Sequence, residues 1–271
     1  MTRTVLITGA GGNIGGKLRA HFAELGWTLR LLDIDPRGDT AIRQADLAQW
    51  DESWVRQFAG VDAVIHLAGD PRAHASWASV QRLNIDLTAN VYAAAVQQRA
   101  RRVVFASSNW VMAGHRPAGR PLTTDMEPYP INPYGVSKLV GERMGLSAHE
   151  RHGVSVICFR IGYLQRGDNR PGPHMGWSRW GQAMWLSNRD LCQAMERAVL
   201  ADGVGFAVLN LMSDNPGMRW DIETTKRVIG YAPQDGVAPV LAEGMEQNER
   251  DADALRLMSE RLDALLRERH W

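Results

Sequence analysis

The fold is decided by residues 5–15, which read Val-Leu-Ile-Thr-Gly-Ala-Gly-Gly-Asn-Ile-Gly. Their apolar start predicts a buried parallel strand, and residues 17–25 carry apolar side chains at helical spacing, so the glycines fall at a strand-to-helix turn. In such a turn Gly9 permits the tight bend, Gly12 lets the backbone approach a pyrophosphate, and Gly15 lets the helix pack closely on the strand. Since the amino end of a helix favours an anion, this stretch predicts a dinucleotide site.

The second predicted strand indicates which dinucleotide is bound. Residues 28–33 form this strand and end in Asp33. A carboxylate about 20 residues beyond the glycine turn can accept hydrogen bonds from both hydroxyls of the adenosine ribose, and it would repel a 2′-phosphate, which favours NAD over NADP. The alternative is a solvated turn carboxylate, because Asp-Ile-Asp-Pro at residues 33–36 is good turn chemistry. Asp46, after a short stretch at residues 42–45, is a second candidate, for contact with adenine.

Length and composition fit one large α/β domain. A chain of 271 residues can bury a full core and is short for two domains, and a net charge of +1 gives no reason to expect nucleic acid or an anionic membrane as partner. No apolar run approaches about 18 residues and no leader precedes the first strand, so we expect a cytoplasmic protein. Cys158 and Cys192 match no metal-ligand spacing and are expected to be reduced core residues. His115 and His174 show no zinc spacing either, so no metal site is expected.

Strand and helix patterns alternate along the chain, which predicts a doubly wound, mostly parallel sheet of about seven strands covered on both faces. Beyond the first stretches, strands are expected at residues 63–68, 102–106, 155–160 and 205–210, and helices at residues 50–58, 79–98, 134–151 and 188–200.

Two stretches interrupt the alternation, residues 109–133 and 163–186, and both are rich in Gly and Pro and follow strands. In open sheets the carboxyl edge of the strands is where ligands bind. The charged tail from residue 243 to 271 has Leu and Met at helical spacing and predicts a surface helix and an oligomer contact, so we expect a homo-oligomer. We expect a single domain in which residues 1–160 mainly bind the cofactor and residues 161–271 form a small substrate cap and this helix.

The chemistry becomes specific at residues 107–110, which read Ser-Ser-Asn-Trp at the end of a predicted strand and precede Tyr134 and Lys138. A Tyr and a Lys four residues apart share a helix face. A phenol with an ordinary pKa of about 10 is a poor base at pH 7, and two cations, the lysine and an oxidised nicotinamide, favour the phenolate. Ser108 then orients the substrate oxygen. Such Tyr–Lys pairs also occur by chance on exposed helices, so the prediction depends on the dinucleotide turn that accompanies them.

These motifs resemble, in order, those of the extended short-chain dehydrogenase/reductase superfamily, the NAD-dependent epimerases and dehydratases. The matching stretches are residues 8–15, Asp33, 45–47 (Ala-Asp-Leu), 66–69 (His-Leu-Ala-Gly), Asn84, 105–108 (Phe-Ala-Ser-Ser) and 134–138 (Tyr-Gly-Val-Ser-Lys). The resemblance implies a Rossmann fold with NAD as cofactor and Ser108, Tyr134 and Lys138 as the catalytic residues. The cofactor contacts that it implies are Gly9, Gly12, Asn13, Ile14, Gly15, Asp33, Asp46, Leu47, Leu67, Ala68, Gly69, Asn84, Tyr134, Lys138 and Ile161.

Within the superfamily the chain most resembles the uronate dehydrogenases, which oxidise the anomeric hydroxyl of a sugar acid to a lactone with NAD. Residues 107–109, 160–162, 185–188 and 213–215 carry this likeness. The chain departs from that group at Trp110, where the group has His, and at Pro71, the position nearest to a substrate-binding Ser. These departures leave dehydrogenase chemistry in place and leave the identity of the sugar open.

The long loop at residues 163–186 suits an acidic sugar. It carries Arg166, Arg170, His174, Trp177, Arg179, Trp180 and Trp185. Guanidinium forks suit anions, and indole faces suit the C–H faces of sugars. The alternative is that the tryptophans fill a cap over the sheet and the arginines face water, while Met175 and Met184 are expected to be packing residues. The candidate substrate-binding residues are Ser108, Asn109, Trp110, Arg170, His174 and Arg179.

The sequence therefore predicts an NAD-dependent dehydrogenase of a sugar or sugar acid. One alternative is a nucleotide-sugar epimerase or dehydratase, which uses the same Ser, Tyr and Lys but returns the hydride. A second is a non-catalytic module that senses NAD and signals to a partner protein. The intact Ser108, Tyr134 and Lys138 argue against this module, because a sensor has no need of a poised base.

Overall fold

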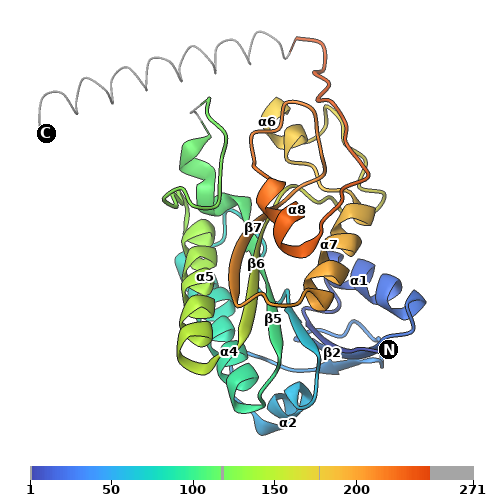
Figure 1. Cartoon of the computed structure of the whole chain (residues 1–271), viewed down its shortest axis with the longest axis vertical. Coiled ribbons are helices and arrows are strands. Elements are labelled where there is room, and N and C mark those ends of the chain that lie inside the picture. Colours follow the sequence, from blue (N-terminus) through green and yellow to red (C-terminus); the bar gives the residue numbers. More distant parts are fainter. Residues whose placement is uncertain (1, 117–118, 177, 245–271) are drawn as a thin grey trace, which may run out of the picture.

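A computed structural model describes residues 2–116, 119–176 and 178–244 of the chain and shows one parallel sheet between two layers of helices (Figure 1). The seven strands lie in the order β3-β2-β1-β4-β5-β6-β7, and each neighbouring pair is parallel. The strand bounds are β1 Thr4–Thr8, β2 Thr28–Asp33, β3 Ile42–Gln44, β4 Ala63–His66, β5 Arg102–Ser108, β6 Ser155–Ile161 and β7 Phe206–Leu211. The predicted doubly wound fold is confirmed.

The strand order places a ligand-binding crevice between β1 and β4. From β1 the chain moves outward through β2 to β3, and then returns to the other side of β1 to begin β4. In doubly wound sheets the crevice opens at the carboxyl ends of the strands where the direction of winding reverses. The glycine turn follows β1 at this point, so the fold is consistent with the nucleotide site that the sequence predicts there.

Two helices cover one face of the sheet. They are α1 (Asn13–Glu24) and α7 (Asn188–Leu200), which pack Leu18, Phe22 and Leu191 against the inward side chains of β1, β5 and β6. A shorter helix, α8 (Glu223–Ile229), adds Ile229 to the same core.

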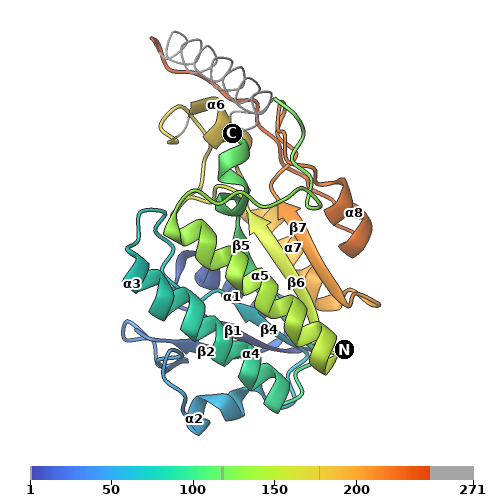
Figure 2. The same cartoon turned by 90° about the vertical axis from the view of Figure 1, so that its left-hand side faces the viewer.

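The other face is covered by α2 (Glu52–Val55), η1 (Arg56–Phe58), α4 (Leu87–Gln97) and α5 (Pro133–His152). Figure 2 shows α4 beside α5 on this face. Helix α5 begins sharply because Asn132 caps it, accepting a hydrogen bond from the Gly135 amide at 2.7 Å, and because Pro133 stands at its first position. It ends at Gly153, whose φ of 72° is the left-handed conformation that closes a helix. These signals fix where Tyr134 sits relative to the sheet.

The predicted helix at residues 79–98 is present but is not regular. It starts earlier, as α3 (Trp77–Val80), passes through a π-helical segment η2 (Gln81–Asp86), and continues as α4. The wide segment turns Asn84 inward, where it is almost fully buried. Periodicity could locate this helix, but it could not show that one part is wound more loosely.

Segments that follow β5, β6 and β7 gather above the carboxyl ends of the strands (Figure 1). The stretch at residues 109–133, which is expected to interrupt the alternation, begins with a 3₁₀ helix, η3 (Asn109–His115). The predicted long loop at residues 163–186 contains a short helix, α6 (Ser178–Ala183). The predicted C-terminal helix lies, from residue 245 onward, outside the described residues, as does Trp177. No helix among the described residues is long and apolar enough to cross a membrane.

Candidate active site

Ser108, Tyr134 and Lys138 meet at the carboxyl end of β5. Ser108 is the last residue of β5, and its hydroxyl hydrogen-bonds to the Tyr134 phenol, which stands in the first turn of α5. One turn further on, the Lys138 ammonium lies 5.7 Å from the centre of the Tyr134 ring and 5.1 Å from that of Phe105. The structure thus brings the three predicted catalytic side chains together, and all three are buried.

Burial dominates the electrostatics of these groups. Removal from water raises the pKa of Tyr134 to about 12, with a smaller contribution from the Asp70 carboxylate, while the hydrogen bond from Ser108 acts in the opposite direction. Burial also lowers the pKa of Lys138 to about 8. That Lys138 and an oxidised nicotinamide together bring the phenol toward the working range stays a prediction, because the protein alone supplies only one of the two charges. An oxidised nicotinamide ring beside the phenol would supply the second positive charge.

The loop after β4 is tied to the catalytic helix by Asn84. Its Oδ1 accepts from the Asp70 amide at 2.7 Å, and its Nδ2 donates to the Asp70 carbonyl at 3.2 Å and to the Ser137 hydroxyl at 3.0 Å. Ser137 in turn donates to the Tyr134 carbonyl at 2.7 Å. Asn84, a predicted cofactor contact, thus uses its side chain to hold Asp70 and α5 in register.

The sequence did not predict the ion pair between Asp70 and Arg72. The buried Asp70 carboxylate accepts from Arg72 Nε at 2.9 Å, from Arg72 Nη2 at 2.6 Å, and from the Ser79 hydroxyl at 2.6 Å. These bonds hold the pKa of Asp70 well below its usual range. Because the carboxylate raises the pKa of Tyr134, its neutralisation by Arg72 bears directly on the phenol. The signal available in the sequence was only Asp-Pro-Arg, an ordinary loop motif.

A buried histidine joins the strands beneath the site. His66 ends β4, and its Nδ1 and Nε2 are hydrogen-bonded to the hydroxyls of Thr8 at 2.8 Å and Thr88 at 3.0 Å. Burial, with a smaller effect of Lys138, lowers the pKa of His66 to about 3. The ring is neutral at physiological pH and fixes β1, β4 and α4 to one another.

The glycine turn fits a dinucleotide. Gly9 has a φ of 72°, and a Cβ there would lie 2.7 Å from the Ala68 amide nitrogen, while a Cβ at Gly15 would lie 2.5 Å from the Gly9 carbonyl oxygen. Gly12 is the N-cap of α1 and offers no side chain to its first amides. The cradle is therefore bare backbone at a helix amino end, which suits a pyrophosphate. The expected roles of these glycines remain predictions that this geometry supports.

Asp33 stands beside the turn at the end of β2. Its Oδ2 accepts from the Gly11 amide at 2.9 Å and its Oδ1 from the Asp35 amide at 3.1 Å. The carboxylate is half-buried and still partly open to a ribose. It shapes the turn, and its role as the charge that favours NAD stays a prediction.

Several other predicted cofactor residues are already engaged. Asp46 is ion-paired with Arg82, and the Leu47 side chain is buried while its carbonyl accepts from Asn90 at 2.9 Å. The Asn13 side-chain amide donates to the Gln165 carbonyl at 3.2 Å, so this side chain is already engaged within the protein. Ile14, Leu67, Ala68 and Gly69 lie half-buried along the crevice, and Ile161 ends β6.

The predicted substrate residues are only partly gathered. Asn109 donates to the Ile161 carbonyl at 3.0 Å, and Trp110 packs against the cluster that contains Tyr134, so both lie beside the catalytic group. By contrast, Arg170 has a side chain 83% exposed and is 3.7 Å from Asp168. His174 is exposed and hydrogen-bonded to Gln165 at 2.8 Å, and Arg179 is exposed on α6.

An aromatic and cationic cluster in the cap was not predicted as a unit. Trp180 and Trp220 meet edge to face at 4.3 Å, and the Arg219 guanidinium lies 4.4 Å from the Trp180 ring centre, with Arg116 at 5.8 Å. Met184 packs into the same group and Met175 is buried, so both methionines are packing residues as expected. These residues come from segments that are distant in the sequence, so no local sequence pattern indicates that they meet.

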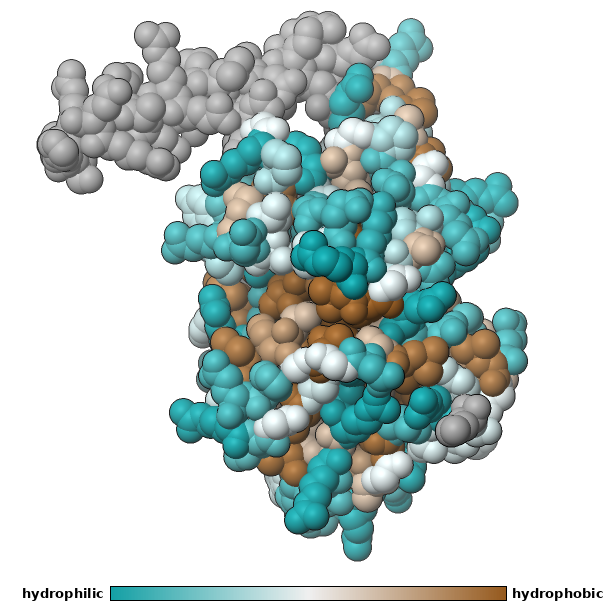
Figure 3. Space-filling view, in the orientation of Figure 1, coloured by the Kyte–Doolittle hydropathy of each residue, from teal (hydrophilic) through white to brown (hydrophobic). Residues whose placement is uncertain are grey.

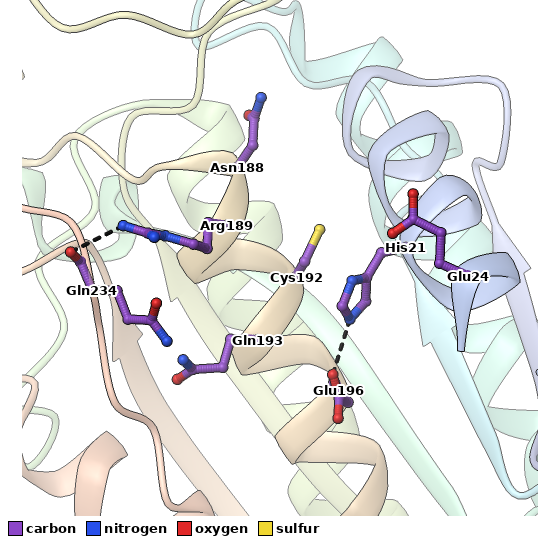
Figure 4. Close-up of a pocket in the computed structure, with 8 residues that line it drawn as sticks. All are labelled: His21, Glu24, Asn188, Arg189, Cys192, Gln193, Glu196 and Gln234. Carbon is purple, nitrogen blue, oxygen red and sulfur yellow. Dashed lines mark hydrogen bonds and ion pairs between the residues drawn. The ribbon is translucent and has the colours of Figure 1, made fainter.

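A cavity of about 420 Å³ lies elsewhere, between α1 and α7 (Figure 4). His21 Nε2 and Glu196 Oε2 are hydrogen-bonded across it at 3.0 Å, and the Cys192 thiol points toward it, with a pKa that burial raises to about 11. Cys192 is half-buried, whereas Cys158 is a core residue as expected, and both are free thiols.

In the face drawn in Figure 3, apolar surface gathers across the middle of the molecule, below a mostly hydrophilic cap. The described residues contain no cluster of His, Cys, Asp and Glu suited to a metal ion.

Comparison with known proteins agrees with this geometry. The chain is 38% identical over 267 residues to the NAD-dependent glucose-6-phosphate dehydrogenase of Haloferax volcanii, covering 90% of this chain and 98% of that protein. It is 32% identical to the uronate dehydrogenase of Pseudomonas putida, over 85% of this chain and 84% of that protein. A solved variant of the uronate dehydrogenase of Agrobacterium tumefaciens, in complex with NAD, superimposes with a TM-score of 0.76 at 28% identity, covering 93% and 90% of the two chains.

These relatives confirm the expected likeness to uronate dehydrogenases and the expectation of NAD as cofactor. The family model described as the NAD dependent epimerase/dehydratase family matches residues 5–165, which include the glycine turn and the three predicted catalytic side chains. The chain belongs to the NAD-dependent epimerase/dehydratase family.

Proposed function

We propose that the protein is an NAD-dependent dehydrogenase that oxidises the anomeric hydroxyl of a sugar or sugar acid to a lactone. The observation that carries the proposal is the Ser108 hydroxyl bonded to the buried Tyr134 phenol, with the Lys138 ammonium one helical turn behind it. This constellation stands at the sheet edge where the glycine turn receives NAD. The arrangement suits proton removal from a substrate hydroxyl held between Ser108 and Tyr134.

Each residue has one task in this reaction. Ser108 donates to the substrate oxygen and orients it, and Tyr134 accepts the hydroxyl proton. When bound, NAD would supply the acceptor for the hydride of the same carbon, which loses two electrons and becomes a carbonyl. Lys138 provides positive charge near the phenolate and would bond the nicotinamide ribose. The ion pair with Arg72 compensates the negative charge of Asp70, which would otherwise oppose formation of the phenolate.

The substrate class is supported by the relatives and by the cap. The relatives named above act, by their names, on glucose 6-phosphate and on uronates, which are sugars with an anionic group at the far end. Arg116, Arg179 and Arg219 provide cations in the cap of this chain, and Trp180 provides an indole face. An anionic aldose could bind both to these arginines, through its anionic group, and to the indole, through its C–H face.

The test is NADH formation with a panel of substrates, comprising glucose 6-phosphate, neutral aldoses, uronic acids and sulfonated sugars. We expect the largest kcat/KM for an anionic aldose and a lactone as product. A substrate that is epimerised without net NADH release would instead assign the chain to the epimerases, and NAD binding without turnover of any sugar would assign it to a sensing role. A cytoplasmic location and a homo-oligomeric state stay predictions.

A further inference from the structure

The segment that follows β6 crosses to the amino end of α1. The Asn13 side chain donates to the Gln165 carbonyl at 3.2 Å, and the Lys17 ammonium donates to the Gly167 carbonyl at 3.3 Å. Asn13 is the first residue of α1 and Lys17 lies one turn on. Arg166 therefore stands between two residues that are tied to the first two turns of the helix bearing the glycine cradle.

The same segment is fixed from its other side. Asn169 accepts from the Gln165 amide at 2.8 Å and donates to the Leu186 carbonyl at 2.7 Å, and the Trp185 indole donates to the Asn169 carbonyl at 2.9 Å. Asn169 is almost fully buried and has a φ of 50°. Residues 165–169 thus form a strap held at both ends, so the position of Arg166 is set before any ligand binds.

The charge of Arg166 has no partner in the described part of the chain. Its side chain is exposed and forms no ion pair or hydrogen bond there, whereas Arg170, four residues on, is 3.7 Å from Asp168. At the same place the first amides of α1 have no side-chain cap, because the N-cap is Gly12. Arg166 therefore belongs to a segment that is tied to the first two turns of α1, the helix whose first amides are open, and its charge has no partner among the described residues.

From this juxtaposition we propose that Arg166 binds the pyrophosphate of NAD and that residues 165–169 strap the cofactor onto the glycine turn. The pyrophosphate carries two negative charges, which the partial positive charge of a helix end matches only in part. A guanidinium fork offers two parallel N–H donors with the geometry that phosphate oxygens prefer. The assignment concerns the cofactor alone and goes beyond the proposed sugar oxidation.

The strap also connects the two ligands. Gln165, whose carbonyl is held by Asn13, bonds through its side chain to His174 and to the Arg170 carbonyl. These residues begin the loop predicted to cover the substrate. Binding of NAD at Arg166 thereby steadies the loop, which gives a physical reason for NAD to bind before the sugar.

The test measures dissociation constants of NAD and ADP-ribose by titration calorimetry, with no sugar present. ADP-ribose carries the pyrophosphate and lacks the nicotinamide. We expect Arg166→Gln to raise the dissociation constants of both ligands about tenfold, which corresponds to the loss of one charge-assisted hydrogen bond. Arg166→Lys should recover part of this loss. The matched control is Arg170→Gln, an exposed arginine of the same segment, which should change neither constant by more than about twofold.

Equal affinity of Arg166→Gln and the unaltered protein for ADP-ribose would overturn the inference, as would an equal loss in Arg170→Gln. A weaker binding of NAD with unchanged binding of ADP-ribose would place Arg166 at the nicotinamide side and also refute it. Thermal unfolding without ligand reports on folding of each variant. Since the readout contains no sugar, failure here leaves the proposed oxidation standing, whereas absence of NAD binding in the unaltered protein would remove the proposed function.

Discussion

The Lys138 ammonium lies over the Tyr134 ring, 5.7 Å from its centre, and no carboxylate in the described part of the chain is ion-paired with it. A buried ammonium without a counter-ion is costly, and the pKa of about 8 expresses that cost. The site therefore holds a cation that opposes folding and serves the reaction. Loss of stability at a functional site is a common consequence of such placement.

Replacement of the lysine should make this trade-off measurable. The folded-state pKa of Lys138 is about 8 and its ordinary value is 10.5. Between these values the unfolded chain binds the proton and the folded chain does not, so stability rises with pH across this window. At pH 7 the buried charge costs roughly 3 kcal/mol. We expect Lys138→Met to unfold at higher urea concentration at pH 7, to show a flatter pH profile, and to lose turnover. A variant less stable than the original at pH 7 would contradict this account.

Removal of the phenolic hydroxyl should stop the chemistry and leave the cofactor in place. Tyr134→Phe should lower kcat by roughly 10²–10⁴, as expected for a general base, with the dissociation constant of NAD nearly unchanged. Tyr129→Phe is the control, because Tyr129 is exposed on the loop before α5 and should tolerate the change. Turnover of Tyr134→Phe at the original rate would remove this residue from the mechanism.

The cofactor preference should depend on the charge of Asp33. Asp33→Asn keeps an oxygen that can accept from the Gly11 amide but loses the negative charge. We expect the ratio of kcat/KM for NAD to that for NADP to fall about tenfold, equivalent to about 1.4 kcal/mol. Asp35→Asn, at an exposed carboxylate that is 3.9 Å from Arg37, should leave the ratio alone. An unchanged ratio in Asp33→Asn would undo the ribose assignment.

Acid stability should report on His66. Its folded-state pKa is about 3, below the ordinary 6.5, so between these values only the unfolded chain takes up the proton. Stability is then lost as the pH falls below 6.5, by roughly 1.4 kcal/mol for each pH unit. His66→Gln should be less stable at pH 7, because the hydrogen bonds with Thr8 and Thr88 are altered, yet its urea midpoint should fall less steeply on acidification. Parallel slopes in the two proteins would show that His66 does not titrate in this way.

The sheet and its main helices could be predicted because their patterns are local. The helix expected at residues 188–200 is α7 with the same bounds, and the one expected at residues 134–151 is α5 with one more residue at each end. Both have capping residues that the sequence displays, Ser187 and Asn132. Helix α8 was missed because only Thr225 and Ile229 of its seven residues are buried, which gives too little periodicity to detect.

The three candidate catalytic residues could be proposed from the sequence, and the structure brings them together, but their surroundings could not be predicted. Ser108, Tyr134 and Lys138 are marked by spacing along one strand and one helix. The ion pair of Asp46 with Arg82 and the meeting of Trp180 with Trp220 join distant segments, so no local pattern announces them. The direction in which burial moves the pKa of Tyr134 also depends on how completely the surrounding chain excludes water, and this follows only from the assembled fold.

The π-helical segment Gln81–Asp86 makes the helix that continues as α4 sensitive to the insertion or deletion of residues. A regular α-helix advances by about 100° for each residue, so a π segment shifts the angular phase of everything after it. Within this segment Asn84 reaches Asp70 and Ser137, and beyond it Thr88 reaches His66. Deletion of a single residue would restore an ordinary helix and swing one of these two partners out of reach. Substitutions are therefore better tolerated here than indels, and descendants of this chain should preserve the residue count between Asn84 and Thr88.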